Sequence, residues 1–293
     1  MKRVRGEYGA YALPALGLVL LLLAGCAAPI SQTSGAATVE RMYVFDCGVN
    51  RAADMTRWTP GLNQGRPYDF SNNCYLIKHA RGLMIWDSGL ADAIAASPEG
   101  ISTAGGAINA RVSKTLLSQM QTVGVTPAQV THVAFSHTHG DHVGNANYFT
   151  SAKLYMQEAE YDAAFGANPA RFGFVPASYE KLRGNTTVKL NGNHDVFGDG
   201  SVTIISTPGH TPGHQSLMVR LAKTGAVVLT GDLVHLQDNW VARRVPAMNV
   251  SAEQTQQSMQ KVADLVAANK AQLWINHDRA ISEKIPKAPQ FID

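Results

Sequence analysis

The sequence has little charge and almost no excess of either sign. Charged residues make up 16% of the 293 residues, and the formal net charge is +3 at pH 7. One acidic and three basic residues precede position 26, so 22 basic and 21 acidic residues follow it. Binding a phosphate backbone needs a clustered basic surface, so we expect no nucleic-acid partner. The 45% hydrophobic content is enough for a large buried core.

The chain also lacks an apolar run long enough for a confident membrane span. The run at residues 11–23 is too short to cross a bilayer as a helix, and it follows Lys2, Arg3 and Arg5. A basic start followed by a short apolar stretch is typical of a secretory signal.

The end of this stretch, Leu23-Ala24-Gly25-Cys26, resembles the bacterial lipobox, in which the cysteine is lipidated and becomes the mature N-terminus. Ala27 follows it, rather than the Asp that retains such lipoproteins at the inner membrane. We therefore expect an outer-membrane lipoprotein facing the periplasm, with membrane contact only through the lipid on Cys26. The alternative is a soluble secreted or periplasmic protein that is cleaved nearby.

Cysteine is scarce, and only Cys47 and Cys74 remain after Cys26. Both lie in strand-like segments, and in an oxidising compartment they are candidates for a disulfide. Sequence cannot place their Cα atoms within bridging distance, so two buried free thiols remain the alternative.

The remaining pattern predicts a signal peptide at 1–25, a flexible tether at 26–40 and one folded domain at 41–293. The tether is rich in Ala, Ser, Thr and Gly, which favour a flexible chain. In the domain, strand-like segments alternate with helical ones, most clearly at 108–123 and 251–268. Such alternation indicates an α/β layered architecture.

The closest grouping of candidate metal ligands is the run His137-Thr138-His139-Gly140-Asp141-His142, which directly follows a strand-like segment. Imidazole and carboxylate are ligands that zinc and its first-row neighbours accept, and no thiolate lies nearby. His137 and His139 point the same way on an extended chain, and Gly140 permits a turn that brings Asp141 and His142 from another side. One cluster could therefore serve two ions, whereas the alternative is a polar loop with surface histidines.

Three further candidate ligands stand where a predicted strand ends. His210 follows the strand at 201–206, Asp232 follows 226–230, and His277 follows 273–275. Loops at strand ends commonly carry the chemistry of α/β proteins. Together with the first cluster, they give five histidines and two aspartates.

In this order, these motifs resemble the dinuclear site of the metallo-β-lactamase fold superfamily, over roughly residues 41 to 280. The run from Thr207 to Leu217, the Thr-Gly-Asp turn at Asp232 and the run Asn276-His277-Asp278 are most similar to N-acyl-homoserine lactonases, which are quorum-quenching enzymes. The resemblance implies a four-layer αββα fold, in which two mixed β-sheets are sandwiched between helices.

The resemblance also implies a ligand set and a reaction. It implies two divalent ions, with zinc expected first and cobalt, manganese or iron as alternatives. Hydroxide bridging the two ions would attack the carbonyl of a lactone or related ester, and Asp141 would manage the proton. The first ion would take His137, His139 and His210, the second would take Asp141, His142 and His277, and Asp232 would bridge them.

Three other polar residues have roles to test around this site. Asp87, at the end of a strand, is expected to orient a metal-bound histidine, or else to cap the following turn. His214 is expected to make a supporting hydrogen bond. His235 stands three residues after Asp232, where the familiar lactonases carry a tyrosine facing the substrate carbonyl. Histidine also donates a hydrogen bond but titrates near neutrality, so we expect a changed pH profile.

The rival functions use the same fold. They are a dizinc all-histidine β-lactamase, which lacks an aspartate at the bridging position, and a thioester hydrolase of the glyoxalase II kind, which normally adds a C-terminal helical domain. A lipoprotein that only binds metal or a partner is the alternative outside enzymes. A homodimer is left open.

Long loops supply apolar residues that could hold the acyl chain of a small-molecule substrate. The segments 48–71 and 166–185 are expected to be irregular, and long loops are often functional. The predicted pocket residues are Met55, Trp58, Phe172, Phe174 and Trp240.

Overall fold

The computed structural model describes Lys2 and residues 39–293. Apart from Lys2, the predicted signal peptide lies outside the described residues, and so do the lipidation site Cys26 and the tether up to residue 38. The folded domain begins at Val39, two residues before the predicted boundary, because Val39 is already the first residue of a strand. No helix in the described part of the chain has the length and apolar content needed to span a bilayer.

The strands and helices follow one another in mixed order. The strands are β1 (Val39–Ala52), β2 (Tyr68–His79), β3 (Gly82–Trp86), β4 (Ile101–Thr103), β5 (Ile108–Arg111), β6 (His132–Ala134), β7 (Lys153–Gln157), β8 (Thr187–Leu190), β9 (His194–Asp195), β10 (Val202–Ser206), β11 (Gln215–Leu221), β12 (Gly225–Leu229), β13 (Gln272–Trp274) and β14 (Phe291–Ile292). The helices are α1 (Leu116–Thr122), α2 (Gly140–Val143), α3 (Glu158–Phe165), α4 (Gln237–Ala242), α5 (Ala252–Asn269) and α6 (Arg279–Ser282).

The strands form two mixed halves that are joined at one edge. One half runs β1-β2-β3-β6-β7-β8, the other runs β10-β11-β12-β13, and β1 meets β11 only at the pair Val39 and Leu221. One large apolar cluster lies between the halves and includes Met42 and Val44 of β1 with Leu217 and Val219 of β11. The halves therefore pack face to face as a sandwich.

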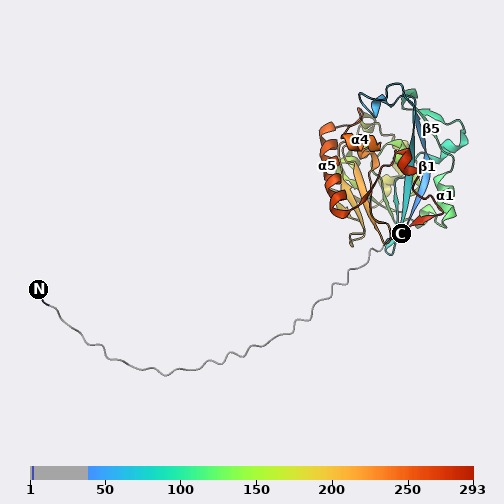
Figure 1. Cartoon of the computed structure of the whole chain (residues 1–293). Helices are drawn as coiled ribbons and strands as arrows, with labels where there is room; N and C mark the ends of the chain where they lie inside the picture. The colour runs from blue at the N-terminus through green and yellow to red at the C-terminus, as the bar shows by residue number, and fades with distance from the viewer. Residues whose placement is uncertain (1, 3–38) are drawn as a thin grey trace. The chain divides into compact units, whose positions relative to one another are not determined.

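Helices cover both outer faces of this sandwich. Leu116 and Met120 of α1 pack in a cluster with Phe45 of β1, whereas Met259 and Val262 of α5 pack on the other half. Figure 1 shows α1 and α5 on opposite sides of the strands. The predicted four-layer αββα arrangement is confirmed.

The long helix α5 begins where its sequence predicts. The Ser251 side chain accepts a hydrogen bond from the Gln254 amide at 3.2 Å, which satisfies one of the free N–H groups of the first turn. The helix then runs from Ala252 to Asn269, close to the predicted end.

Two predictions of local structure were wrong. Residues 108–111 form the strand β5, because Ile108 and Ala110 alternate with more exposed neighbours, and the helix α1 begins only at Leu116. The segment 48–71 is also less irregular than predicted, since β1 continues to Ala52. A bulge after Asp46 disguises its alternation in the sequence.

The cysteine pair lies on these two long strands. Cys47 of β1 and Cys74 of β2 form a disulfide, with Cα atoms 5.9 Å apart. The bridge packs beside Gly89, where an added Cβ would lie 2.2 Å from the Cys47 Cβ. The open choice between a disulfide and two free thiols is thus decided for the disulfide.

Candidate metal centre

The seven predicted ligands meet at one end of the sandwich. They lie on the segments that follow β6, β10, β12 and β13, with Asp141 and His142 on the short helix α2, so segments 140 residues apart in sequence converge here. Their ligand atoms fall into groups whose members lie within 4.8 Å of one another. The two principal groups are His137, His139, His210 and Asp232, and Asp141, His142 and His277.

In the first group, ring nitrogens face one another. His137 Nε2 lies 2.8 Å from His139 Nδ1, which lies 3.1 Å from His210 Nε2. The outward nitrogens of two of these rings meet oxygen acceptors, Phe172 O at 2.9 Å from His139 and Asn249 Oδ1 at 2.9 Å from His210. If the outward nitrogens carry the ring protons, the inward nitrogens have free lone pairs that point toward one another. Such a group of converging lone pairs can bind a cation.

The second group is built in the same way. His142 Nδ1 lies 3.0 Å from Asp87 Oδ2, and His277 Nδ1 lies 2.8 Å from the Ser71 carbonyl oxygen. Their inward Nε2 atoms are 3.3 Å apart. The Asp141 Oδ2 atom lies 3.9 Å from the first of these atoms and 3.7 Å from the second. Two imidazoles and a carboxylate therefore surround a second position for a cation.

Asp232 lies between the two groups. Its Oδ1 atom is 2.9 Å from His277 Nε2 and 3.1 Å from His142 Nε2. Its Oδ2 atom is 3.3 Å from His210 Nε2 and 3.7 Å from His137 Nε2. One oxygen thus faces each group, which is the arrangement that a bridging carboxylate requires.

Burial and charge set the protonation of this cluster. Burial lowers the pKa of His137 well below its usual value. Burial opposes a charged His142, but the Asp232 and Asp87 carboxylates together raise its pKa well above the usual value. Burial would raise the pKa of Asp232, yet the surrounding imidazoles, His277 first, hold it well below the usual range. Asp232 is therefore held in its ionised form, whereas His137 is held in its neutral form.

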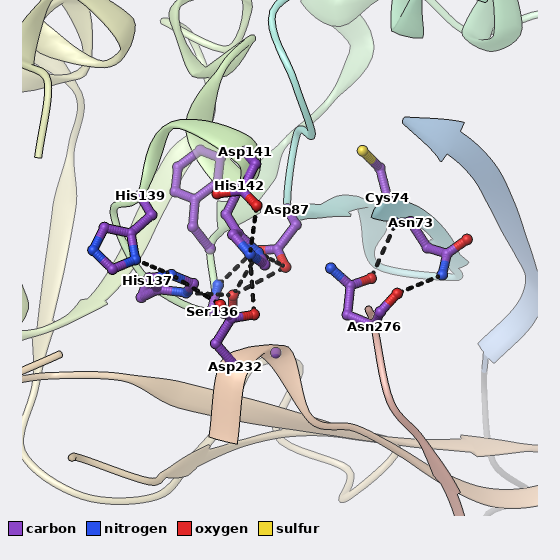
Figure 2. Close-up of polar contacts among 12 residues, drawn as sticks. Asn73, Cys74, Asp87, Ser136, His137, His139, Asp141, His142, Asp232 and Asn276 are labelled. Carbon is purple, nitrogen blue, oxygen red and sulfur yellow. Dashed lines mark hydrogen bonds and ion pairs between the residues drawn. The ribbon is translucent and has the colours of Figure 1, made fainter. Parts of the chain in front are cut away.

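The supporting residues are placed largely as the sequence suggested. Asp87 accepts a hydrogen bond from the Ser136 amide at 2.6 Å and contacts His142 Nδ1, whereas Asp232 contacts Nε2 of the same ring. Figure 2 shows both carboxylates beside His142. His214 Nε2 accepts a hydrogen bond from the Asp232 amide at 2.9 Å, so it holds the backbone of the bridging residue. Burial lowers the pKa of His214 to about 3, which keeps this nitrogen free to accept.

Other supporting contacts were not predicted from the sequence. Asn276 Oδ1 accepts from the Asn73 amide at 3.0 Å, which fixes the loop carrying His277 to β2 (Figure 2). The contact of Asn249 with His210 and the contacts of the buried Glu160 were also not predicted. Each acts through a partner distant in sequence, so no local pattern marks it.

A cavity of about 680 Å³ opens above the metal centre. Of the predicted pocket residues, Trp58 and Phe172 line it, and so do Asp141 and His235. The other apolar lining comes mainly from Phe70, Leu90, Ile94, Ile108 and Met248.

The prediction was wrong for Met55, Phe174 and Trp240, which do not line this cavity. Met55 is 3% exposed and packs behind Trp58, and Phe174 is 2% exposed with its ring 5.5 Å from that of His139. Trp240 packs against the cluster under α5. Met55 and Phe174 therefore pack against residues of the site, Trp58 and His139, without reaching the cavity themselves.

His235 sits at the junction between the cavity and the cluster. Its Nε2 atom is 3.1 Å from Asp232 Oδ2, and its ring stacks on that of His277 with centroids 5.3 Å apart. Its Nδ1 atom is buried and has no hydrogen-bond partner within residues 39–293. In this arrangement His235 serves the bridging carboxylate, and its donation to a substrate carbonyl stays a prediction.

An αββα sandwich with this donor set defines a metallo-β-lactamase-type protein, and the comparisons agree. A sequence model of the metallo-beta-lactamase superfamily matches residues 67–269. The N-acyl homoserine lactonase AttM of Azorhizobium caulinodans is 33% identical over 245 residues, 79% of this chain and 92% of that protein. An N-acyl homoserine lactonase from a Bacillus species is 27% identical and covers 87% of this chain and 100% of its own length.

Solved structures show the same fold. A structure of a Bacillus thuringiensis AiiA variant with bound N-decanoyl-L-homoserine has a TM-score of 0.77 and 24% identity, and covers 87% of this chain and 100% of its own. The chain belongs to the metallo-beta-lactamase superfamily. The predicted resemblance to N-acyl-homoserine lactonases is confirmed as well.

Proposed function

We propose that this protein is a dinuclear metal-dependent hydrolase that opens the ring of N-acyl homoserine lactones or closely related esters. The observation that carries the proposal is the set of seven donors converging in two groups beneath a largely apolar cavity. Relatives that share most of the chain are named as lactonases of this kind. A lactone head at the metals with an acyl chain along the cavity would fit this site.

The donor set fits two cations, and zinc is the ion we propose first. Two bound ions would supply a shared water whose lowered pKa makes hydroxide available near neutral pH, and would polarise the ester carbonyl. The residues that would hold the first ion are His137, His139 and His210, those for the second are Asp141, His142 and His277, and Asp232 would be shared.

We assign proton transfer during ring opening to Asp141. It is the more exposed of the two carboxylates and lines the cavity, and its Oδ2 accepts from Asn50 Nδ2 at 2.8 Å. In the reaction, water oxygen bonds to the carbonyl carbon, the ring C–O bond breaks, and a proton passes to the leaving alkoxide. A carboxylate held at the cavity floor can take that proton and return it, which gives an acyl hydroxy acid.

The function is tested by three parallel assays of the purified, metal-loaded protein. The substrates are an N-acyl homoserine lactone, a cephalosporin and a thioester, with ring opening or hydrolysis followed by proton release. We expect kcat/KM to be highest on the lactone. A higher value on the cephalosporin or the thioester would replace this proposal with one of the rival activities.

We predict that Phe172→Ala selectively weakens turnover of long acyl chains. Each methylene buried against the ring contributes about 0.8 kcal/mol. Loss of contact with about two methylenes should therefore cost a decanoyl substrate roughly tenfold in kcat/KM, and a butanoyl substrate, which reaches less of the ring, less than about threefold. The matched control is Phe291→Ala. The Arg171 guanidinium lies 5.5 Å from the centre of the Phe172 ring, and the Arg41 guanidinium lies 4.4 Å from that of Phe291, but Phe291 stands outside the cavity. Equal losses on both chain lengths would remove Phe172 from the acyl site.

We further propose that the protein is anchored in the outer membrane by a lipid on Cys26 and works in the periplasm. The disulfide between Cys47 and Cys74 supports an oxidising compartment. We predict that wild-type protein partitions into the detergent phase of a Triton X-114 extract, whereas Cys26→Ser moves to the aqueous phase. Wild-type protein in the aqueous phase would favour the soluble alternative.

A further inference from the structure

Glu160 is a buried carboxylate that belongs to none of the predicted roles. It lies in the first turn of α3 and is 1% exposed, although both of its neighbours on the helix are more accessible. A buried carboxylate without compensating bonds is strongly unfavourable, so its partners indicate what it holds. All of its hydrogen-bond partners among residues 39–293 are uncharged donors.

Four donors converge on this carboxylate, two on each oxygen. Oε1 accepts from the amide of Thr138 at 2.8 Å and from its hydroxyl at 2.9 Å. Oε2 accepts from the Thr211 hydroxyl at 2.8 Å and from the Gly213 amide at 3.0 Å. Burial raises the pKa of Glu160, and these four bonds oppose that rise by stabilising the charged form.

The donors stand on two separate metal-binding loops. Thr138 lies between His137 and His139, and Thr211 directly follows His210. The loops are about 70 residues apart in sequence, and the carboxylate joins them by one oxygen each. It thereby joins the loops that carry His139 and His210, whose Nδ1 and Nε2 atoms lie 3.1 Å apart.

The second loop also approaches α3 too closely for a side chain at Gly213. A Cβ built there would lie 2.3 Å from the Glu160 backbone nitrogen and 2.6 Å from its Cβ. Glycine at this position allows the loop to reach the carboxylate. The contact is therefore built from both sides, by a buried acid on the helix and by a residue without a side chain on the loop.

We propose that Glu160 is the positioning residue for the first metal ion, and that it sets the affinity of the His137, His139 and His210 group without acting on the second group. The second group is held by other contacts, through Asp87 and Ser71. This inference rests on the proposed two-ion site. Metal analysis of the wild-type protein tests that site independently.

The test is a chelator titration of Glu160→Gln loaded with Co²⁺, followed by the visible absorption of the bound cobalt. Glutamine has nearly the same size as glutamate, but its NH₂ group would face two of the four hydrogen-bond donors. Loss of an outer partner of a metal ligand typically reduces metal affinity 10- to 100-fold, and we expect that loss for one ion only. The remaining ion should keep its wild-type affinity, and kcat should fall more than KM changes.

Two further variants keep the test decisive. Asp92→Asn is the matched control, because Asp92 is also a buried carboxylate that accepts backbone amides, from Leu116 at 2.6 Å and Leu117 at 3.2 Å, but it stands outside both metal groups. It should lower the melting temperature and leave both affinities unchanged. If Glu160→Gln does not fold, Thr211→Val takes its place. It removes one of the four donors, so the affinity for the same ion should fall by a smaller factor. Equal weakening of both ions, or no weakening of either, would overturn the proposal.

Discussion

Replacing Asp232 with Asn is expected to reduce kcat/KM on the lactone by roughly a thousandfold, or about 4 kcal/mol of transition-state stabilisation. Each oxygen of Asp232 faces a different group of imidazoles, at 2.9 Å from His277 and 3.3 Å from His210. The amide keeps one oxygen and presents an NH₂ group to the other side, where a cation is expected. We therefore expect about half of the bound metal to be lost, which elemental analysis of the purified variant would show.

The stability effect of this substitution can be separated from its effect on the site. Asp232 is 4% exposed, so removing its charge changes a buried cluster as well as a ligand. Asp92→Asn also removes a buried charge but should leave metal content and activity close to wild type. An Asp232→Asn protein with two bound ions and more than about a tenth of wild-type activity would mean that this carboxylate does not bridge the metals.

The metal ligands could be predicted from sequence because their chemistry is local. His137, His139 and His142 stand within six residues, and His210, Asp232 and His277 each follow a strand. Strand ends commonly carry the chemistry of α/β proteins, which marked these residues as candidates, and the resemblance to the metallo-β-lactamase superfamily implied how they divide between two ions. The structure brings all of them together, as the resemblance implied.

The supporting contacts could not be predicted in this way. Glu160 stands on a short helix whose sequence gives no sign of which face is buried, and its partners Thr138 and Thr211 are 22 and 51 residues away. Asn249 likewise meets His210 only because the chain after α4 returns to the site. Such contacts depend on how the layers pack, which a pattern of strands and helices does not determine.

The apolar residues that line the cavity could also be predicted only in part. Trp58 and Met55 are three residues apart on one turn, yet the first lines the cavity and the second packs behind it. Phe172 and Phe174 divide in the same manner on the opposite wall. Apolar character predicts that a loop residue is covered, but it does not tell whether a ligand or the protein covers it.

Removing the metals is expected to abolish lactone hydrolysis while leaving the protein folded. Bound ions stabilise only the native state, by about 2.7 kcal/mol per site when the free ion is at 100 times its dissociation constant. Two sites would therefore raise the melting temperature by about 10 to 20 °C for a domain of this size. Calorimetry of the loaded, chelator-treated and reloaded protein measures this difference directly.

The contacts around the ligands explain why the metal-free protein should keep its fold. The Asp87 carboxylate, the Ser71 carbonyl and the Glu160 carboxylate hold the ligand loops through bonds that need no ion. Reloading with zinc should then restore activity without a refolding step, and far-ultraviolet circular dichroism should stay constant throughout. Full activity after chelation, with no metal found by elemental analysis, would show that the seven converging donors do not act through bound cations.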